Sequence, residues 1–156
     1  MAMPLSDKGP YLNAALLCEK VLEEQDGVRS LIRVVDRVTN AAAGQDPPSE
    51  MPSFTISLMC VIFMKAGEAR GRYAIKLRPE DPSGHKVGDA EVPVQFEPPG
   101  NRGITLQMPL NIQIDLEGVY WFDVLFVDQR AGTEELLTRL PLQILYQPQK
   151  TGGSAS

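Results

Sequence analysis

Strict alternation of apolar and polar residues is the feature that most constrains the fold of this chain. It is clearest in residues 104–114, where one parity holds Ile104, Leu106, Met108, Leu110, Ile112 and Ile114 and the other holds Thr105, Gln107, Asn111 and Gln113. Successive side chains of a strand point to opposite faces of a sheet, so this pattern predicts a half-buried strand. Residues 54–64, 72–78 and 90–96 alternate in the same way. An all-β fold is therefore expected.

Turn residues between these segments predict how the strands connect. The stretch K-A-G-E-A-R-G, between 54–64 and 72–78, predicts a hairpin. Pro93 cannot donate a backbone hydrogen bond and assigns its strand to a sheet edge. Two further strands are expected in 119–127 and 140–146, joined through D-Q-R-A-G-T-E.

Residues 12–38 fit two structures. The apolar residues of 28–38 would cover one face of a helix, with Arg29, Arg33 and Arg37 on its other side. However, E-E-Q-D-G separates two runs of similar length, and the second run is rich in β-branched residues. We predict a hairpin, with the helix as the alternative.

The expected organisation is one domain with short flanking segments. A chain of 156 residues is long enough to bury its own core. We expect a flexible N-terminal arm in 1–10, a single domain in 11–147 and a disordered tail in 148–156. A long loop is expected at 40–53, of which 41–52 forms either a loop or a short helical turn.

Composition limits the partners and the compartment. A net charge of -5 and a pI near 4.9 argue against nucleic acid, because phosphate neutralisation needs clustered Lys and Arg. The longest apolar run, 58–64, is too short for a membrane span. The N-terminus has no secretory pattern, so a cytoplasmic protein is predicted. Cys18 and Cys60 are then expected to be buried free thiols.

The stretch L-E-G-V-Y-W-F resembles the corner that enters the sixth lettered strand of the immunoglobulin-like family. Gly118 and Tyr120 match that pattern, whereas Leu116 stands where the family has Asp and Phe122 where it has Cys. The resemblance implies a Greek-key β-sandwich of about eight antiparallel strands. It also implies that the Tyr120 hydroxyl returns to the backbone upstream.

The whole chain also resembles a small uncharacterised bacterial β-sandwich family. The resemblance is carried by C-E-K-V-L-E-E-Q-D-G-V-R-S-L-I-R-V-V-D (18–36), the R-P-E-D-P-S-G loop and the closing R-L-P-L-Q-I. It implies strands in 18–36 and a bacterial cytoplasm, and it implies no activity.

No motif in the chain predicts catalysis or a metal centre. The only histidine, His85, lies in a predicted exposed turn, and neither cysteine has a nucleophile setting. One histidine and two buried cysteines do not form a zinc site.

The acidic loop with Glu80, Asp81 and Asp89 could supply oxygen ligands to calcium, although a solvated hairpin is the simpler interpretation. A single tryptophan makes a weak sugar platform. We therefore predict no enzyme, no catalytic residue and no cofactor.

Two predicted strands, in residues 54–64 and 119–127, carry apolar side chains on both faces. A strand with one solvent-exposed face normally has polar side chains on that face. The resemblance to an immunoglobulin-like sandwich implies that these two strands are central neighbours of one sheet, so their surplus side chains would merge into an outer patch of Met59, Val61, Phe63, Trp121 and Leu125. Arg72 and Lys76 would supply its polar rim. We predict that a protein partner or a second copy docks there. The alternative is that 41–52 or the N-terminal arm covers the patch.

The predicted function is accordingly a non-enzymatic interaction or assembly module. A β-sandwich that binds carbohydrate, lipid or calcium, or an enzyme of unrecognised type, is the alternative.

Overall fold

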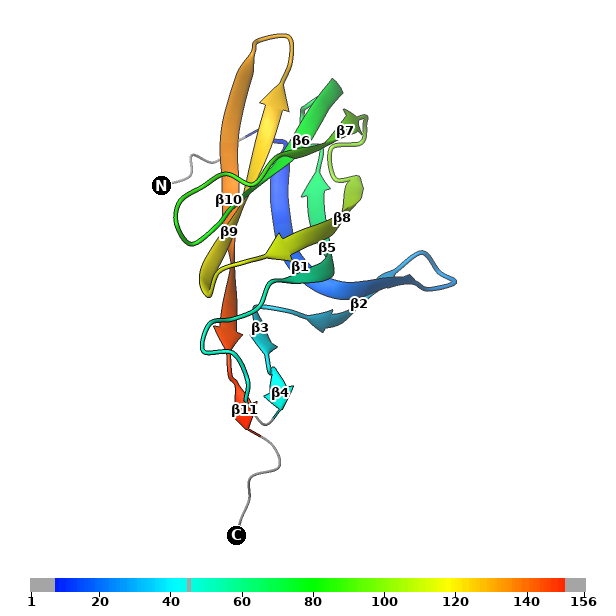
Figure 1. Cartoon of the computed structure of the whole chain (residues 1–156). Coiled ribbons are helices and arrows are strands. Elements are labelled where there is room, and N and C mark those ends of the chain that lie inside the picture. The colour runs from blue at the N-terminus through cyan, green and yellow to red at the C-terminus, as the bar shows by residue number, and fades with distance from the viewer. Residues whose placement is uncertain (1–7, 45, 151–156) are drawn as a thin grey trace.

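The computed structural model describes residues 8–44 and 46–150, and over these residues the chain forms strands and no helix (Figure 1). The all-β prediction is confirmed. Every strand expected from the alternation is present, and three short strands, β3, β4 and β11, were not predicted. The elements are β1 (Tyr11–Glu23), β2 (Arg29–Val34), β3 (Arg37–Asn40), β4 (Ala43–Gly44), β5 (Phe54–Lys65), β6 (Gly71–Glu80), β7 (Ala90–Phe96), β8 (Gly103–Ile114), β9 (Gly118–Asp128), β10 (Thr133–Tyr146) and β11 (Gln149–Lys150).

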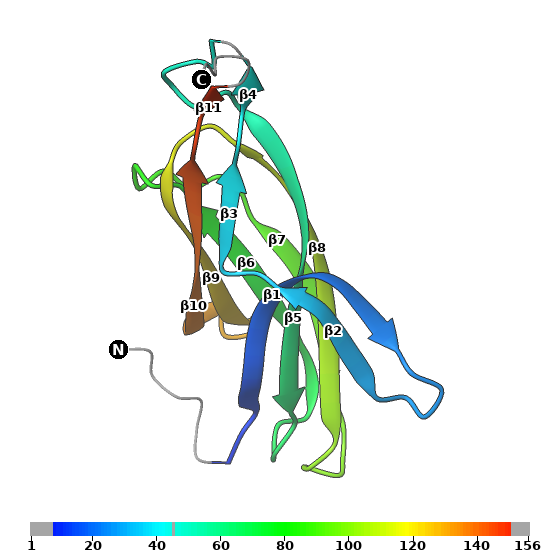
Figure 2. The same cartoon turned by 90° about the horizontal axis from the view of Figure 1, so that it is seen from below.

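The strands form two large sheets and one small one. Sheet A has the order β2-β1-β5-β8 and is antiparallel. Sheet B has the order β3-β10-β9-β6-β7 and is mixed, because β3 runs parallel to β10. The short strands β4 and β11 pair in parallel at one end of the molecule (Figures 1 and 2).

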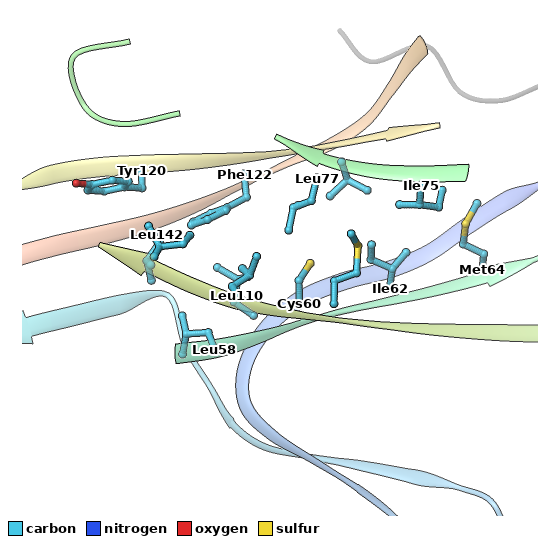
Figure 3. Packing of buried hydrophobic residues seen from close by; sticks show 14 of the residues in the cluster. Leu58, Cys60, Ile62, Met64, Ile75, Leu77, Leu110, Tyr120, Phe122 and Leu142 are labelled. Atoms are coloured by element: carbon cyan, nitrogen blue, oxygen red, sulfur yellow. The ribbon is translucent and has the colours of Figure 1, made fainter. Parts of the chain in front are cut away.

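One apolar cluster joins the two large sheets. Side chains from sheet A, among them Leu58, Cys60 and Ile62, point toward Leu77 and Phe122 of sheet B (Figure 3). The alternation of β8 is confirmed, since its even-numbered side chains face this cluster and its odd-numbered ones from Gln107 to Gln113 are exposed. Burial of this cluster is the main favourable term in folding.

The predicted hairpin between 54–64 and 72–78 is wrong. Strand β5 pairs with β1 and β8 in sheet A, whereas β6 pairs with β7 and β9 in sheet B. The connecting loop crosses between the sheets and is held by backbone bonds, in which Gly67 N–H donates to Gly100 O (2.7 Å) and Glu68 N–H donates to Lys8 O (2.6 Å). A Cβ on Gly67 would lie 2.5 Å from the Lys8 carbonyl oxygen, so only glycine fits this crossing.

The hairpin predicted in 12–38 is confirmed as β1 and β2. The residues Tyr11–Cys18 of β1 pair with β5, and the residues Cys18–Glu23 pair with β2. Strand β1 bends where it changes partner, and the β1–β2 hairpin turns away from the line of β5 (Figures 1 and 2).

The structure describes only the inner parts of the flanking segments. Residues 1–7 and 151–156, the outer parts of the expected arm and tail, lie outside the described residues. Within them Pro10 is buried and Gln149–Lys150 form β11, so the flexibility of the arm and the disorder of the tail stay predictions. In 41–52, Ala43–Gly44 form β4, and neither this strand nor 46–52 contains a helical turn.

The tyrosine corner has the predicted hydrogen bonds. The Tyr120 side chain is 2% exposed, and its hydroxyl oxygen accepts from the backbone N–H groups of Asp115 and Leu116, both at 3.3 Å. Gly118, which precedes it, has φ 126° and a Cβ there would lie 2.9 Å from Pro82. Glycine at this position therefore lets the 80–89 loop approach the corner.

Candidate interaction surfaces

The residues predicted to form one outer patch lie on two different sheets. Met59, Val61 and Phe63 belong to β5 in sheet A, and Trp121 and Leu125 belong to β9 in sheet B. The prediction of a single merged patch is therefore wrong. Its error follows from treating β5 and β9 as neighbours, which the crossing loop after β5 prevents.

The β5 half of the predicted patch is covered by the β1–β2 hairpin. Arg29 on β2 donates from Nη1 to Thr105 Oγ1 on β8 at 3.3 Å, and Thr105 lies directly opposite Phe63. The hairpin thus reaches across β5 to β8, in agreement with Figure 2. Val61 is 0% exposed even though it faces away from the main cluster. Met59 and Phe63 beside it are half-buried, so the outer face of β5 is largely covered, and the contact at Thr105 indicates that the hairpin, instead of 41–52, covers it.

The β9 half is covered by charged side chains of neighbouring strands. Lys76 and Arg78 on β6 both bond Glu134, at the start of β10, with Arg78 Nη2 at 3.1 Å from its carboxylate. Lys76 stands directly opposite Leu125, which is 7% exposed. The aliphatic stems of such residues shield apolar surface while their charged ends stay in water.

Trp121 is also covered by a cation. The Arg139 guanidinium lies 4.6 Å from the centre of the Trp121 ring, bonds Asp123 at 2.6 Å and reaches Glu80 at 3.0 Å. Of the two predicted rim residues, Lys76 therefore belongs to this ion-pair network and Arg72 is exposed. Whether these residues bind a partner stays a prediction.

The ion pairs around β9 shift the pKa values of their side chains in the direction expected for paired charges. The hydrogen bond from Lys76, followed by that from Arg78, lowers the pKa of Glu134, and the hydrogen bond to Glu134 raises the pKa of Lys76. The bond to Asp123 likewise raises the pKa of Arg139. Exposed pairs of this kind stabilise little each, so their main effect is a polar cover over β9.

An apolar surface that the sequence reasoning missed lies on the β1–β2 hairpin. Register places Lys20 opposite Ile32, and Val21 opposite Leu31, so the two faces of the hairpin can be told apart. Arg29 reaches sheet A from one face, and on the other face the apolar side chains beyond the buried Cys18 are exposed. That face and the turn carry what we call the hairpin strip: Leu22 (39% exposed), Val28 (61%), Ile32 (38%) and Val34 (57%).

The strip had a signal in the sequence. Val28, Ile32 and Val34 share one parity and Leu31 has the other, so 28–34 is apolar on both faces, as β5 and β9 are. This pattern was not recognised because residues 12–38 also fit a helix. In a helix the same apolar residues would lie on one buried face and would need no further cover.

The acidic loop does not present free carboxylates for a metal ion. Glu80 pairs with Lys86 and Arg139, and Asp89 pairs with Arg78. Asp81 accepts from the Ser83 hydroxyl and from the backbone N–H groups of Ser83 and His85, and these bonds, led by the hydroxyl, lower the pKa of Asp81. Within 8–44 and 46–150 no group of three or more His, Cys, Asp or Glu side chains is placed to hold a metal.

The two cysteines are buried and unbonded to each other, as predicted. Cys60 faces the main cluster, and burial, reinforced by the charge of Cys18, raises the pKa of the Cys60 thiol to about 12. Leu17 is the residue of β1 directly opposite Cys60, so Cys18 faces the other side of sheet A. Its thiol donates to the Lys20 carbonyl at 3.6 Å beneath the bend.

Comparison with known proteins gives no assignment. No protein-family model matches the chain, and no curated protein matches it. In the described part of the chain no helix is long and apolar enough to cross a membrane.

Proposed function

We propose that this chain is a non-enzymatic protein-interaction or assembly module of a bacterial cytoplasm, built as an immunoglobulin-like β-sandwich. The observation that carries the proposal is the hairpin strip. Four large apolar side chains are exposed together on one projecting hairpin, although the equivalent surplus on β5 and β9 is covered. An exposed apolar patch of this kind usually marks an interface.

The strand order supports the immunoglobulin-like part of the proposal. If β9, which follows the tyrosine corner, is taken as strand F, then β10, β6 and β7 take the places of G, C and C′. Strands β1, β5 and β8 then take the places of A, B and E in the other sheet. In this assignment, no strand of the described residues stands in the place of D, beside β8.

The polar part of the hairpin is suited to a selective interface. Glu24 accepts from Ser30 at 2.9 Å beside Leu22 of the strip, and Glu19 and Arg33 form an ion pair at 2.7 Å on the other face of the hairpin. Charged residues around an apolar centre favour one partner over others, because mismatched charges oppose binding.

The test is a pair of substitutions that keep strand propensity and remove apolar surface. The Ile32→Thr, Val34→Thr double variant should fold with an unchanged melting temperature and lose at least tenfold in affinity for a partner recovered by the parent chain. If the partner is a second copy, light scattering should show a smaller particle.

Leu116→Gln is the matched control, because Leu116 is 41% exposed but lies in the turn before β9, away from the hairpin. It should bind as the parent does. Equal binding by all three chains, or a parent that stays monomeric and recovers no protein, would refute the proposed function.

A further inference from the structure

Strand β8 is a long free edge of sheet A without charged side chains. It pairs with β5 on one side and with no strand of the described residues on the other. Its sequence, G-I-T-L-Q-M-P-L-N-I-Q-I, has twelve residues and no Asp, Glu, Lys or Arg. Free edges are normally blunted by charge or by short length, because unpaired backbone groups invite another strand.

The three other edges of the large sheets follow that rule. The six-residue β2 carries Arg29 and Arg33, the four-residue β3 carries Arg37, and the seven-residue β7 carries Glu91 together with Pro93. Strand β8 differs from all three in length and in charge, and its single protective feature is Pro109.

A groove of about 430 Å³ runs beside the C-terminal half of β8, between that strand and residues 77–90, which are the end of β6, the following loop and the first residue of β7. Its apolar lining comes from both sheets and includes Leu77, Val87, Leu110 and Ile112. Asp89 and Asp115 also line it. Asp115 forms no ion pair in the described chain, whereas Asp89 pairs with Arg78.

Pro109 indicates which backbone groups of β8 are free. The β5–β8 ladder runs without a register shift, and Pro109 lies opposite Met59. In an antiparallel ladder alternate residues direct their N–H and C=O groups to the neighbour, so proline fits where the N–H would point away from β5. Gln107 and Asn111 share this orientation, and their backbone N–H groups therefore face the free edge.

We propose that β8 binds an extended segment of another protein as an added strand, with alternate side chains of that segment filling the groove. Such strand addition takes affinity from main-chain hydrogen bonds and specificity from pockets for every second side chain. The uncharged edge fits an uncharged, alternating segment, and Asp115 favours a Lys or Arg at the end that lies beside it. This site is separate from the hairpin strip, because the groove lies beside residues 109–115, whereas the hairpin contacts β8 through Arg29 at Thr105.

A second copy of the chain fits this edge less well. Pairing two β8 strands about a two-fold axis would bring two copies of Pro109 into one ladder and lose two donors. The side chains of the second copy that could enter the groove, Met108, Leu110 and Ile112, are already buried in its own core. A partner segment has neither constraint.

The probe is a displayed library of random dodecapeptides, selected against the whole chain. Enriched peptides should alternate apolar and uncharged polar residues, and their binding should slow hydrogen exchange at the Gln107 and Asn111 amides. Gln107→Pro removes one free N–H without touching the β5 ladder, and it should weaken the enriched peptides at least tenfold. Gln107→Ala, the matched control, keeps the N–H and should bind as the parent does.

Three outcomes would overturn the proposal: no peptide bound with a Kd below about 100 µM, equal binding to the Pro and Ala variants, or no change in exchange at Gln107 and Asn111. The exchange measurement uses the parent chain and stands even if Gln107→Pro fails to fold. Pro109→Thr restores the missing donor and should tighten peptide binding. If Pro109→Thr instead forms dimers that exclude the peptides, the natural occupant is a second copy and the partner segment is refuted.

Discussion

Truncation of Val61 tests whether the β1–β2 hairpin really covers sheet A. Val61→Ala removes two methyl-sized groups from a site that is 0% exposed. At about 0.8 kcal/mol for each buried group, the transfer part of the loss is about 1.6 kcal/mol. The cavity left between β5 and the hairpin raises this to about 2 to 2.5 kcal/mol, because the surroundings collapse only in part.

The assay is urea unfolding of the variant beside Val34→Ala. Both changes delete the same atoms from a strand, but Val34 is 57% exposed, so its loss should stay within about 0.5 kcal/mol. For a domain of this size the Val61 variant should melt about 4 to 10 °C below the parent. Hydrogen exchange in β2 should also quicken, since the hairpin loses a contact that holds it to the sheet.

A Val61→Ala loss as small as that of Val34→Ala would refute the reasoning. It would mean that the outer face of β5 is open to solvent and that the contact between Arg29 and Thr105 does not hold the hairpin over it. The predicted docking role of Met59, Val61 and Phe63 would then be restored for that sheet.

Three other predictions concern the corner, the thiols and the ion-pair network. Tyr120→Phe removes the acceptor of two backbone N–H groups and should cost on the order of 1 kcal/mol in urea unfolding without changing the fold; an unchanged midpoint would contradict the role of the corner. Cys60, with its pKa raised to about 12, should resist a thiol reagent at pH 8 in the native chain and react fully in denaturant, and rapid native labelling would contradict its place in the core. The pKa of Glu134 is lowered in the folded chain, so its contribution to stability is present above the unfolded pKa and is lost as pH falls through the folded one. Glu134→Gln should therefore lower the melting temperature near neutral pH more than at pH 3, and an equal change at both would contradict the pairing with Lys76 and Arg78.

Local alternation predicted most strands, because side-chain period depends on the strand alone. Residues 104–114 show this best, with the predicted inward set facing the core along β8. The hydrogen bonds of the corner could also be predicted, since Tyr120 bonds backbone groups only four and five residues away.

Pairing between strands was harder to predict, because it depends on contacts distant in sequence. The loop after β5 has the composition of a hairpin turn, but its path is set by backbone bonds to Lys8 and Gly100. Those partners lie far from it in the chain, and no pattern within the loop itself indicates them. The short strands β4 and β11 pair across an even longer stretch of sequence and were missed for the same reason.

Apolar residues on both faces of a strand show that something covers the second face, and they do not show what covers it. Three strands here share that pattern and differ in outcome. Strand β5 is covered by a hairpin of the same chain, β9 is shielded by the stems of Lys76 and Arg139, and β2 keeps Ile32 and Val34 in solvent.

This difference in exposure depends on the adjacent strands of each sheet. Strand β9 is central in its sheet and has cations on both sides, whereas β2 is an edge with one neighbour and cannot be shielded in the same way. Ion pairs shield Trp121 and Leu125 on the outer face of sheet B, and both surfaces that we propose as binding sites, the hairpin strip and the β8 edge, belong to sheet A. One partner could occupy both at once, because the groove lies beside residues 109–115 of the chain, whereas the hairpin meets β8 at Thr105.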